Sequence, residues 1–286
     1  MEQPKPQNAD ILTRLATLDR RIIFIVIAFA VAIPIFFPLG LPIAPTKSVI
    51  GAYDYTEKLK PGSLLLFSYD YGPSTKVELH PMVLAAMDQV LKKDCKIIGM
   101  ALYPEGQALC DESFAAMMKL HPDKKYGVDL VNLGYKAGNE GVLVSLGLDF
   151  RGLFPVDARG TPLSDIPALR RITRLQDFDL VASYSAGYPG ALEHIRLTNA
   201  QYGLPLIVGT TAVQTPQYYP YFNSGQLKGL IGGLGGAAEY EKLSGFEGTA
   251  TSGMDAQSIA HFVIAAFILM ANIIYFLQWR DRQEAR

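Results

Sequence analysis

The sequence predicts a doubly wound α/β domain held between two transmembrane helices. Residues 22–44 and 258–279 contain no Asp, Glu, Lys or Arg, and each is long enough to cross a hydrocarbon core of roughly 30 Å. Between them, short apolar runs alternate with helix-like stretches from residue 63 onward. This alternation is typical of a parallel sheet covered by helices. The predicted parts, in order, are a tail (1–21), a span (22–44), the domain (45–257), a span (258–279) and a tail (280–286).

Basic residues lie at the end of each span that adjoins a terminal tail, and they predict the topology. Arg20 and Arg21 directly precede the first span, and Arg280 directly follows the second. The positive-inside rule therefore places both termini in the cytoplasm and the domain in the periplasm or outside the cell. The first span is interpreted as an uncleaved anchor, because its small-x-small triplet at residues 30–32 lies in the middle of the apolar run. Pro34 and Pro38 are expected to loosen its outer half.

Five apolar runs predict the strands of the domain. They cover residues 63–69, 96–103, 129–135, 179–184 and 205–210. The intervening stretches predict helices at residues 77–92, 108–121, 139–149, 165–171 and 190–202. Because the strands are apolar throughout rather than alternating, both faces of the sheet should be buried. The predicted fold is a five-stranded, mostly parallel sheet of the Rossmann or flavodoxin type.

Composition argues against several classes of function. The formal net charge is −1, and the sequence shows no basic stripe that would attract the phosphates of a nucleic acid. The four histidines and two cysteines are scattered, so no metal site and no cofactor are predicted. Cys95 should open a strand and Cys110 should lie in the helix beyond it, about 20 Å away at the rise of a strand. Two free buried thiols are expected rather than a disulfide.

Polar residues gather where the predicted strands end. The carboxyl ends of parallel strands share one edge of the sheet, and ligands of such folds bind there. The candidate ligand-binding residues are Asp70, Ser74, Glu105, Ser183, Ser185, Thr210 and Thr211. They would suit a small polar ligand. The alternative is that they are ordinary turn residues, and Asp70 and Glu105 could be either a carboxylate pair or two turn acceptors.

The segment Ser183-Tyr184-Ser185-Ala186-Gly187 has the setting of a nucleophile elbow, because a predicted strand precedes it and a predicted helix follows. Ser185 is the candidate catalytic residue. A working serine needs a base within reach. His194 lies inside the next helix and His261 inside the second span, so neither is expected to serve. A turn or hydrogen-bonding role for Ser185 is therefore favoured over catalysis.

Glycines recur between residues 224 and 240 at steps of three and four. Gly229, Gly232, Gly233 and Gly236 would form a groove along one helical face. We interpret this segment as a helix that packs closely against the edge of the sheet or against another subunit. Gly233, Gly235 and Ala238 also match the spacing of a dinucleotide fingerprint, but no strand is predicted directly before them and they come late in the fold.

Four aromatic residues, Tyr218, Tyr219, Tyr221 and Phe222, crowd a segment that Pro220 predicts to be a loop. They could rest at the level of the lipid headgroups or anchor a protein interface. Packing into the core is the alternative.

Three functions remain open, in this order. The first is a non-enzymatic subunit of a membrane assembly that contacts the bilayer and other subunits, or copies of itself, through the glycine and tyrosine surfaces. The second is an extracytoplasmic domain that binds or senses a small polar ligand at the strand ends. The third is a membrane-anchored serine hydrolase that uses Ser185.

Overall fold

The computed structural model describes residues 19–284 of the chain. It divides into two units, one of residues 42–251 and one that joins the chain before residue 42 to the chain after residue 251. The first unit is the α/β domain and the second holds the long apolar helices.

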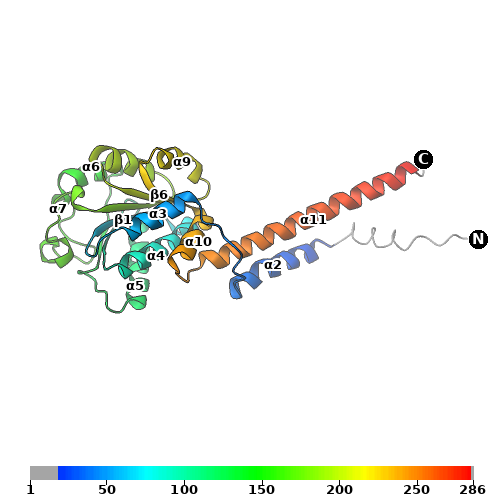
Figure 1. Ribbon diagram of the computed structural model, residues 1–286, viewed down its shortest axis with the longest axis horizontal. Coiled ribbons are helices and arrows are strands. Elements are labelled where there is room, and N and C mark those ends of the chain that lie inside the picture. The colour runs from blue at the N-terminus through cyan, green and yellow to red at the C-terminus, as the bar shows by residue number, and fades with distance from the viewer. Residues whose placement is uncertain (1–18, 285–286) are drawn as a thin grey trace, which may run out of the picture. The chain divides into compact units, whose positions relative to one another are not determined.

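The domain is built on six parallel strands (Figure 1). They are β1 (Leu64–Asp70), β2 (Lys96–Ala101), β3 (Leu130–Tyr135), β4 (Leu180–Ser185), β5 (Leu206–Thr210) and β6 (Leu227–Gly232). Their order is β3-β2-β1-β4-β5-β6, which is the order of the doubly wound Rossmann fold. The predicted parallel α/β architecture is confirmed, but the sheet has six strands where five were predicted.

Helices cover both faces of this sheet (Figure 1). They are α3 (Lys47–Glu57), α4 (Lys76–Lys92), α5 (Gly106–Leu120), α6 (Glu140–Leu148), α7 (Phe150–Leu153), α8 (Ala191–His194), α9 (Thr215–Asn223) and α10 (Gly233–Ser244). A π-helical stretch, Ile195–Ala200, continues α8. Leu64 and Leu66 pack in one core cluster with α6 and α7, whereas Leu65 and Phe67 face α4 and α10. All seven residues of β1 are buried, as expected for a central parallel strand.

The glycine-rich segment is not the predicted single helix. Residues 227–232 form β6, and α10 begins at Gly233. Gly229 lies opposite α3, where a Cβ atom would come within 2.3 Å of Ala52. This glycine therefore permits a close approach inside the domain. The expectation that no strand precedes Gly233 is also wrong, although β6 is the edge strand and the last one in the chain.

The aromatic segment is a helix rather than the predicted loop. In α9, Pro216 occupies the first turn, where its missing N–H costs nothing, and Pro220 lies inside the helix. Tyr218 is 2% exposed, and Tyr221 and Phe222 pack partly buried against the core. Tyr219 remains 41% exposed.

The first predicted span is shorter than expected. Helix α2 (Arg20–Phe36) has 17 residues, and residues 37–46 are not helical. It ends just before Pro38, which disfavours helical geometry at Phe37. Beyond it, the carboxylate of Asp255 accepts the N–H groups of Leu39, Gly40 and Leu41 at 2.9, 2.9 and 3.1 Å, which ties that segment to α11 (Ala250–Glu284).

The second predicted span belongs to the longest helix, α11 (Ala250–Glu284). Within residues 19–284, the stretch Ala250–Arg280 is the one helix long and apolar enough to cross a membrane by length and composition. Little of its most apolar part is buried, unlike a helix in a soluble core. Where two such helices were predicted, the described part of the chain has one.

Candidate functional site

The order of the strands reverses between β1 and β4, and ligands of doubly wound folds bind at such a point. Asp70, the last residue of β1, lies opposite Ser185, the last residue of β4. Two residues earlier, Ser68 lies opposite Ser183. All four residues are fully buried. Paired positions of neighbouring strands point to the same face, so these polar side chains form one cluster, which we call the switch-point cluster.

The Asp70 carboxylate is held from three elements. Ser68 Oγ donates to Oδ2 at 2.7 Å, and the backbone N–H of Leu102, just after β2, donates to Oδ1 at 2.8 Å. His194 Nε2 lies 3.6 Å from Oδ2. A buried carboxylate is tolerated when such partners surround it. Asp70 therefore ties β1, β2 and α8 together.

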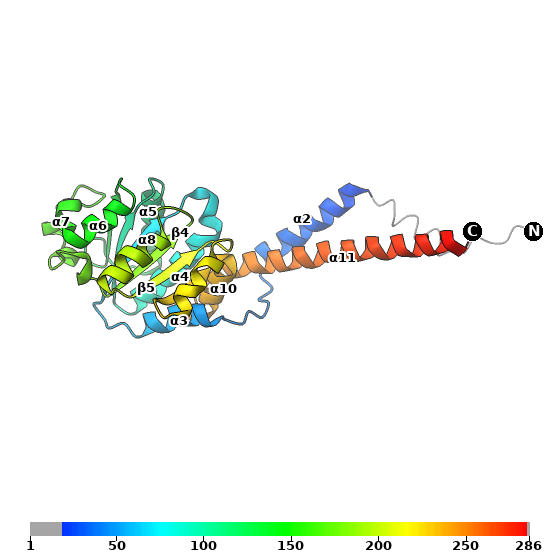
Figure 2. The ribbon, with the colours of Figure 1, turned by 90° about the horizontal axis from the view of Figure 1, so that it is seen from above.

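His194 joins this cluster although sequence reasoning set it aside. Helix α8 lies over β4 and β5 (Figure 2) and places the ring of its last residue beside Asp70. Nδ1 of His194 lies 3.1 Å from Thr198 Oγ1. Among the described residues, neither His194 Nε2 nor Ser183 Oγ has a hydrogen-bond partner. The ring is fully buried, and the sequence around His194 does not reveal this contact, because Asp70 belongs to a distant strand.

Ser185 is engaged in the backbone rather than aimed at a substrate. Its Oγ accepts the N–H of Ala191 at 2.9 Å, and Glu193 Oε2 accepts the N–H of Gly190 at 2.8 Å. These two contacts satisfy N–H groups at the start of α8, as capping side chains do. No contact joins Ser185 to His194 among those the described residues make. The geometry is that of the turn role favoured from the sequence.

The other predicted ligand-binding residues do not join the cluster. Ser74 and Glu105 are exposed, and no bond in the described chain pairs Glu105 with Asp70. Thr210 Oγ1 donates to Gln214 Oε1 at 3.0 Å, and the carbonyl of Thr211 accepts from Thr215 Oγ1 at 2.8 Å. The two threonines therefore organise the start of α9.

Tyr103 lies near the switch-point cluster, close to Asp70 and Glu193. Its hydroxyl donates to the carbonyl of Tyr188 at 3.0 Å, which links the loop after β2 to the loop after β4. Burial raises the pKa of Tyr103, and the carboxylates of Asp70, Glu193 and Glu105 raise it further. Three carboxylates therefore lie near the Tyr103 hydroxyl.

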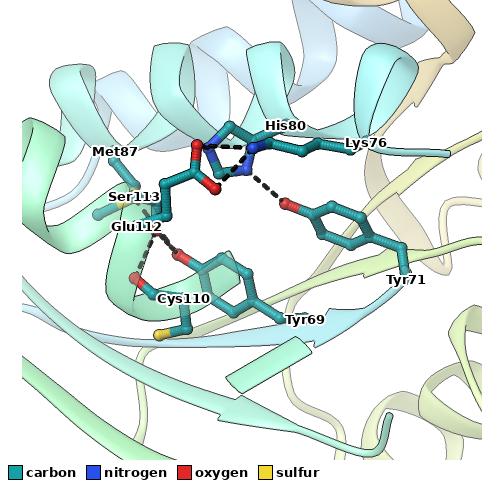
Figure 3. Close-up of polar contacts among 8 residues, drawn as sticks. All are labelled: Tyr69, Tyr71, Lys76, His80, Met87, Cys110, Glu112 and Ser113. Atoms are coloured by element: carbon teal, nitrogen blue, oxygen red, sulfur yellow. Dashed lines mark hydrogen bonds and ion pairs between the residues drawn. The ribbon is translucent and has the colours of Figure 1, made fainter. Parts of the chain in front are cut away.

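A second polar network lies on the other face of β1 (Figure 3). Tyr71 O–H and His80 Nδ1 are 2.9 Å apart. Burial lowers the pKa of His80 to about 4, with a smaller lowering by Lys76 that the Glu112 carboxylate opposes. Lys76 and Glu112 form an ion pair at 2.6 Å beside the ring. His80 is therefore a neutral hydrogen-bonding partner near neutral pH.

Behind this network lie the aromatic and thiol groups of the core (Figure 3). Tyr69 and Ser113 share a hydrogen bond of 2.8 Å, and Ser113 Oγ donates to the carbonyl of Cys110 at 2.9 Å. Cys110 and Cys95 are free and buried, as predicted. Burial raises the pKa of the Cys110 thiol well above its usual value, which makes it a poor nucleophile.

Comparison with known proteins adds little. No family model and no curated protein matches the chain. Among solved structures, the crystal structure of AibC is similar, with 12% sequence identity and a TM-score of 0.29. The similarity covers 85% of this chain but 55% of the AibC chain. A likeness at this level supports no inference about function.

Proposed function

We propose that the chain is a non-enzymatic, membrane-anchored subunit of a membrane protein assembly, whose α/β domain lies outside the cytoplasm and makes protein contacts. The observation that carries the proposal is the sealed switch point. Asp70, Ser185 and His194 are fully buried there and contact other parts of the chain. A fold of this type that worked on a substrate would need these groups to face an open crevice.

Helix α11 supports the anchoring part of the proposal. Phe262, Leu269 and Tyr275 are 73%, 63% and 71% exposed, an apolar surface that needs lipid or a protein partner. Arg280 marks the end of the apolar stretch, and Arg20 and Arg21 mark the start of α2. Basic residues at both of these ends favour a cytoplasmic location for the two termini.

Helix α2 fits a second membrane crossing when its extension is included. Its apolar part, residues 22–36, measures about 22 Å at the rise of an α-helix. Phe37 and Pro38, which are not helical, add about 6 Å in an extended conformation. The sum reaches roughly the 30 Å of the hydrocarbon core. Leu39 is then the first residue outside the core, where Asp255 accepts its N–H.

The partner-binding surface proposed here is the exposed side of α9. Tyr219 is 41% exposed, whereas Tyr218 is buried in the domain. Exposed tyrosines are enriched at protein interfaces. Gly229 packs against α3 inside the domain. The proposed interface therefore leaves out this glycine, which the sequence predicted to be part of it.

The test is the mass of the native particle. We expect the full chain, extracted from its own membrane in mild detergent, to elute with a partner or as more than one copy. Tyr219→Asp should weaken this association, whereas Leu148→Asp should not, because Leu148 is 75% exposed on a different helix, α6. A lone monomer before and after cross-linking would contradict the proposal.

A second candidate function is the binding of a small polar ligand at the switch-point cluster. The buried Ser183 Oγ and His194 Nε2, without partners in the described chain, favour it, because buried polar atoms in proteins are usually hydrogen-bonded. The nearby carboxylates favour a neutral or cationic ligand. Thermal-shift screening of the full chain and of Ser183→Ala tests this candidate. If every stabilising compound acts equally on both proteins, the candidate is withdrawn.

The hydrolase alternative has a direct test as well. Because Ser185 Oγ is buried and bonded to the N–H of Ala191, we expect no labelling of this residue by a fluorophosphonate probe. Labelling that Ser185→Ala abolishes would restore the catalytic interpretation.

A further inference from the structure

An open pocket lies far from the switch-point cluster, at the opposite ends of the covering helices. Its cavity volume is about 570 Å³, within the range of small-molecule sites. The second half of α4, the end of α5 and the turn after α10 line it. Leu84, Met117, Leu120 and Phe246 supply an apolar wall. An apolar wall of this size with a few polar groups is the usual composition of a site for a small organic molecule.

A buried carboxylate lies at the base of this pocket. The Asp88 side chain is 2% exposed, which is rare for an aspartate unless it is paired. His121 Nε2 lies 2.9 Å from Oδ1. Lys92 Nζ forms an ion pair with Oδ2 at 2.7 Å, and Oδ2 has no hydrogen-bond partner among the described residues. Among the described residues, one oxygen of this buried carboxylate thus depends on a single flexible cation, Lys92, which also lines the pocket.

The charged side chains that line the pocket favour a cationic ligand. Asp88 and the exposed Glu247 provide two carboxylates, and Lys92 provides one ammonium group. The Lys92 side chain is 53% exposed, so it can turn into water at little cost. We propose that this pocket binds a small organic ammonium compound, whose cationic head replaces Lys92 at Asp88 Oδ2 while its apolar body contacts Met117 and Phe246. Charge-assisted hydrogen bonds of this kind are among the stronger polar contacts.

Two probes with similar bodies and opposite charges test the proposal. The full chain is reconstituted in lipid nanodiscs, and binding of 2-phenylethylammonium and of 3-phenylpropionate is measured by calorimetry, with empty nanodiscs as the blank. We expect saturable binding of the ammonium compound and binding of the carboxylate weaker by at least about tenfold, which corresponds to one charged hydrogen bond.

Three variants separate a binding role from a structural one. Asp88→Asn should weaken ammonium binding at least about tenfold. Lys92→Met should tighten ammonium binding several-fold, because it removes the competing cation, an effect that loss of structure would not produce. Glu247→Gln, at an exposed position, should weaken it about twofold. If Asp88→Asn fails to fold, the other two variants still decide the matter.

The proposal is overturned by any of three results. The first is the absence of saturable ammonium binding up to about 10 mM, a range that covers weak fragment-like affinities. The second is that 3-phenylpropionate binds as tightly as the ammonium compound or more tightly. The third is that the ammonium compound binds Lys92→Met more weakly than the parent chain.

Discussion

Two buried histidines lie on opposite faces of β1. His194 lies beside Asp70, and His80 is hydrogen-bonded to Tyr71, whose ring stacks on Tyr69. His194 contacts the last residue of the strand, and His80 contacts the residue after it, at the point where the order of the sheet reverses. The carboxyl end of β1 is thus filled by side chains of this chain, which is the basis of the non-enzymatic proposal.

Asp70 and Glu105 were predicted together, and the structure gives them different roles. In Asp70→Asn, the side-chain N–H₂ would face one of two donors, Ser68 Oγ or the Leu102 N–H. Two buried hydrogen-bond donors that face each other leave at least one of them unsatisfied, which lowers the free energy of unfolding by about 2–3 kcal/mol. We expect this loss of unfolding free energy in chemical denaturation followed by circular dichroism. Glu105→Gln, at an exposed position, is the control and should change stability by less than about 0.5 kcal/mol. Equal effects would contradict the assignment.

His80 should make stability depend on pH. Its pKa is about 4 in the folded chain, below its ordinary value of 6.5. As the pH falls through this window, the unfolded chain takes up the proton first, so stability is lost. The contribution of His80 is complete above about pH 6.5 and falls by about 3 kcal/mol toward pH 4. Denaturation of the parent chain and of His80→Gln at several pH values should differ by this amount. Parallel pH curves would refute the prediction.

At the scale of elements, the first five strands could be predicted because each is a continuous apolar run. For example, residues 63–69 were predicted and Leu64–Asp70 is observed. β6 could not be predicted, because its sequence, LKGLIG, contains glycine at a position where the strand packs closely against Ala52, far away in the chain. His194 was missed for the same reason, because its neighbour Asp70 belongs to a distant strand. Local sequence patterns carry no information about such contacts.

The close approach of α3 to β6 should be sensitive to a single methyl group. Gly229→Ala would place Cβ 2.3 Å from Ala52, so backbone must shift, at a cost of about 1–3 kcal/mol. Gly141→Ala is the matched control, because nothing lies within 4 Å of its added Cβ and alanine suits helix α6. A thermal-shift assay should show a lower melting temperature for the first variant only. A similar melting temperature for both would show that α3 can move away from β6.

The start of α11 depends on one carboxylate of the domain. Glu241 accepts the N–H of Ala250 at 2.9 Å, and both the N–H and the Oγ1 hydroxyl of Thr251 at 2.8 Å. Glu241→Gln removes the charge and one acceptor, which should cost about 1–2 kcal/mol. Glu247→Gln, at a neighbouring exposed position, should be nearly neutral. The free energy of unfolding of the two variants checks this difference, and equal values would exclude a capping role for Glu241.

The whole molecule combines an α/β domain, in which the switch-point cluster is buried, with an apolar helix, Ala250–Arg280, that is long and apolar enough to cross a membrane. The sequence indicated both parts. It did not indicate that the crevice is filled, because that depends on side chains from β1, β4 and α8 meeting in space. The proposed role as an assembly subunit follows from these two features together.

The sidedness of the domain is tested most directly by labelling one introduced thiol in intact cells. Cys95 and Cys110 are buried and should not react, whereas Glu105→Cys would place a thiol at an exposed position of the domain. We predict that a membrane-impermeant maleimide labels this variant without permeabilisation. Labelling that appears only after the membrane is opened would place the domain in the cytoplasm and contradict the account.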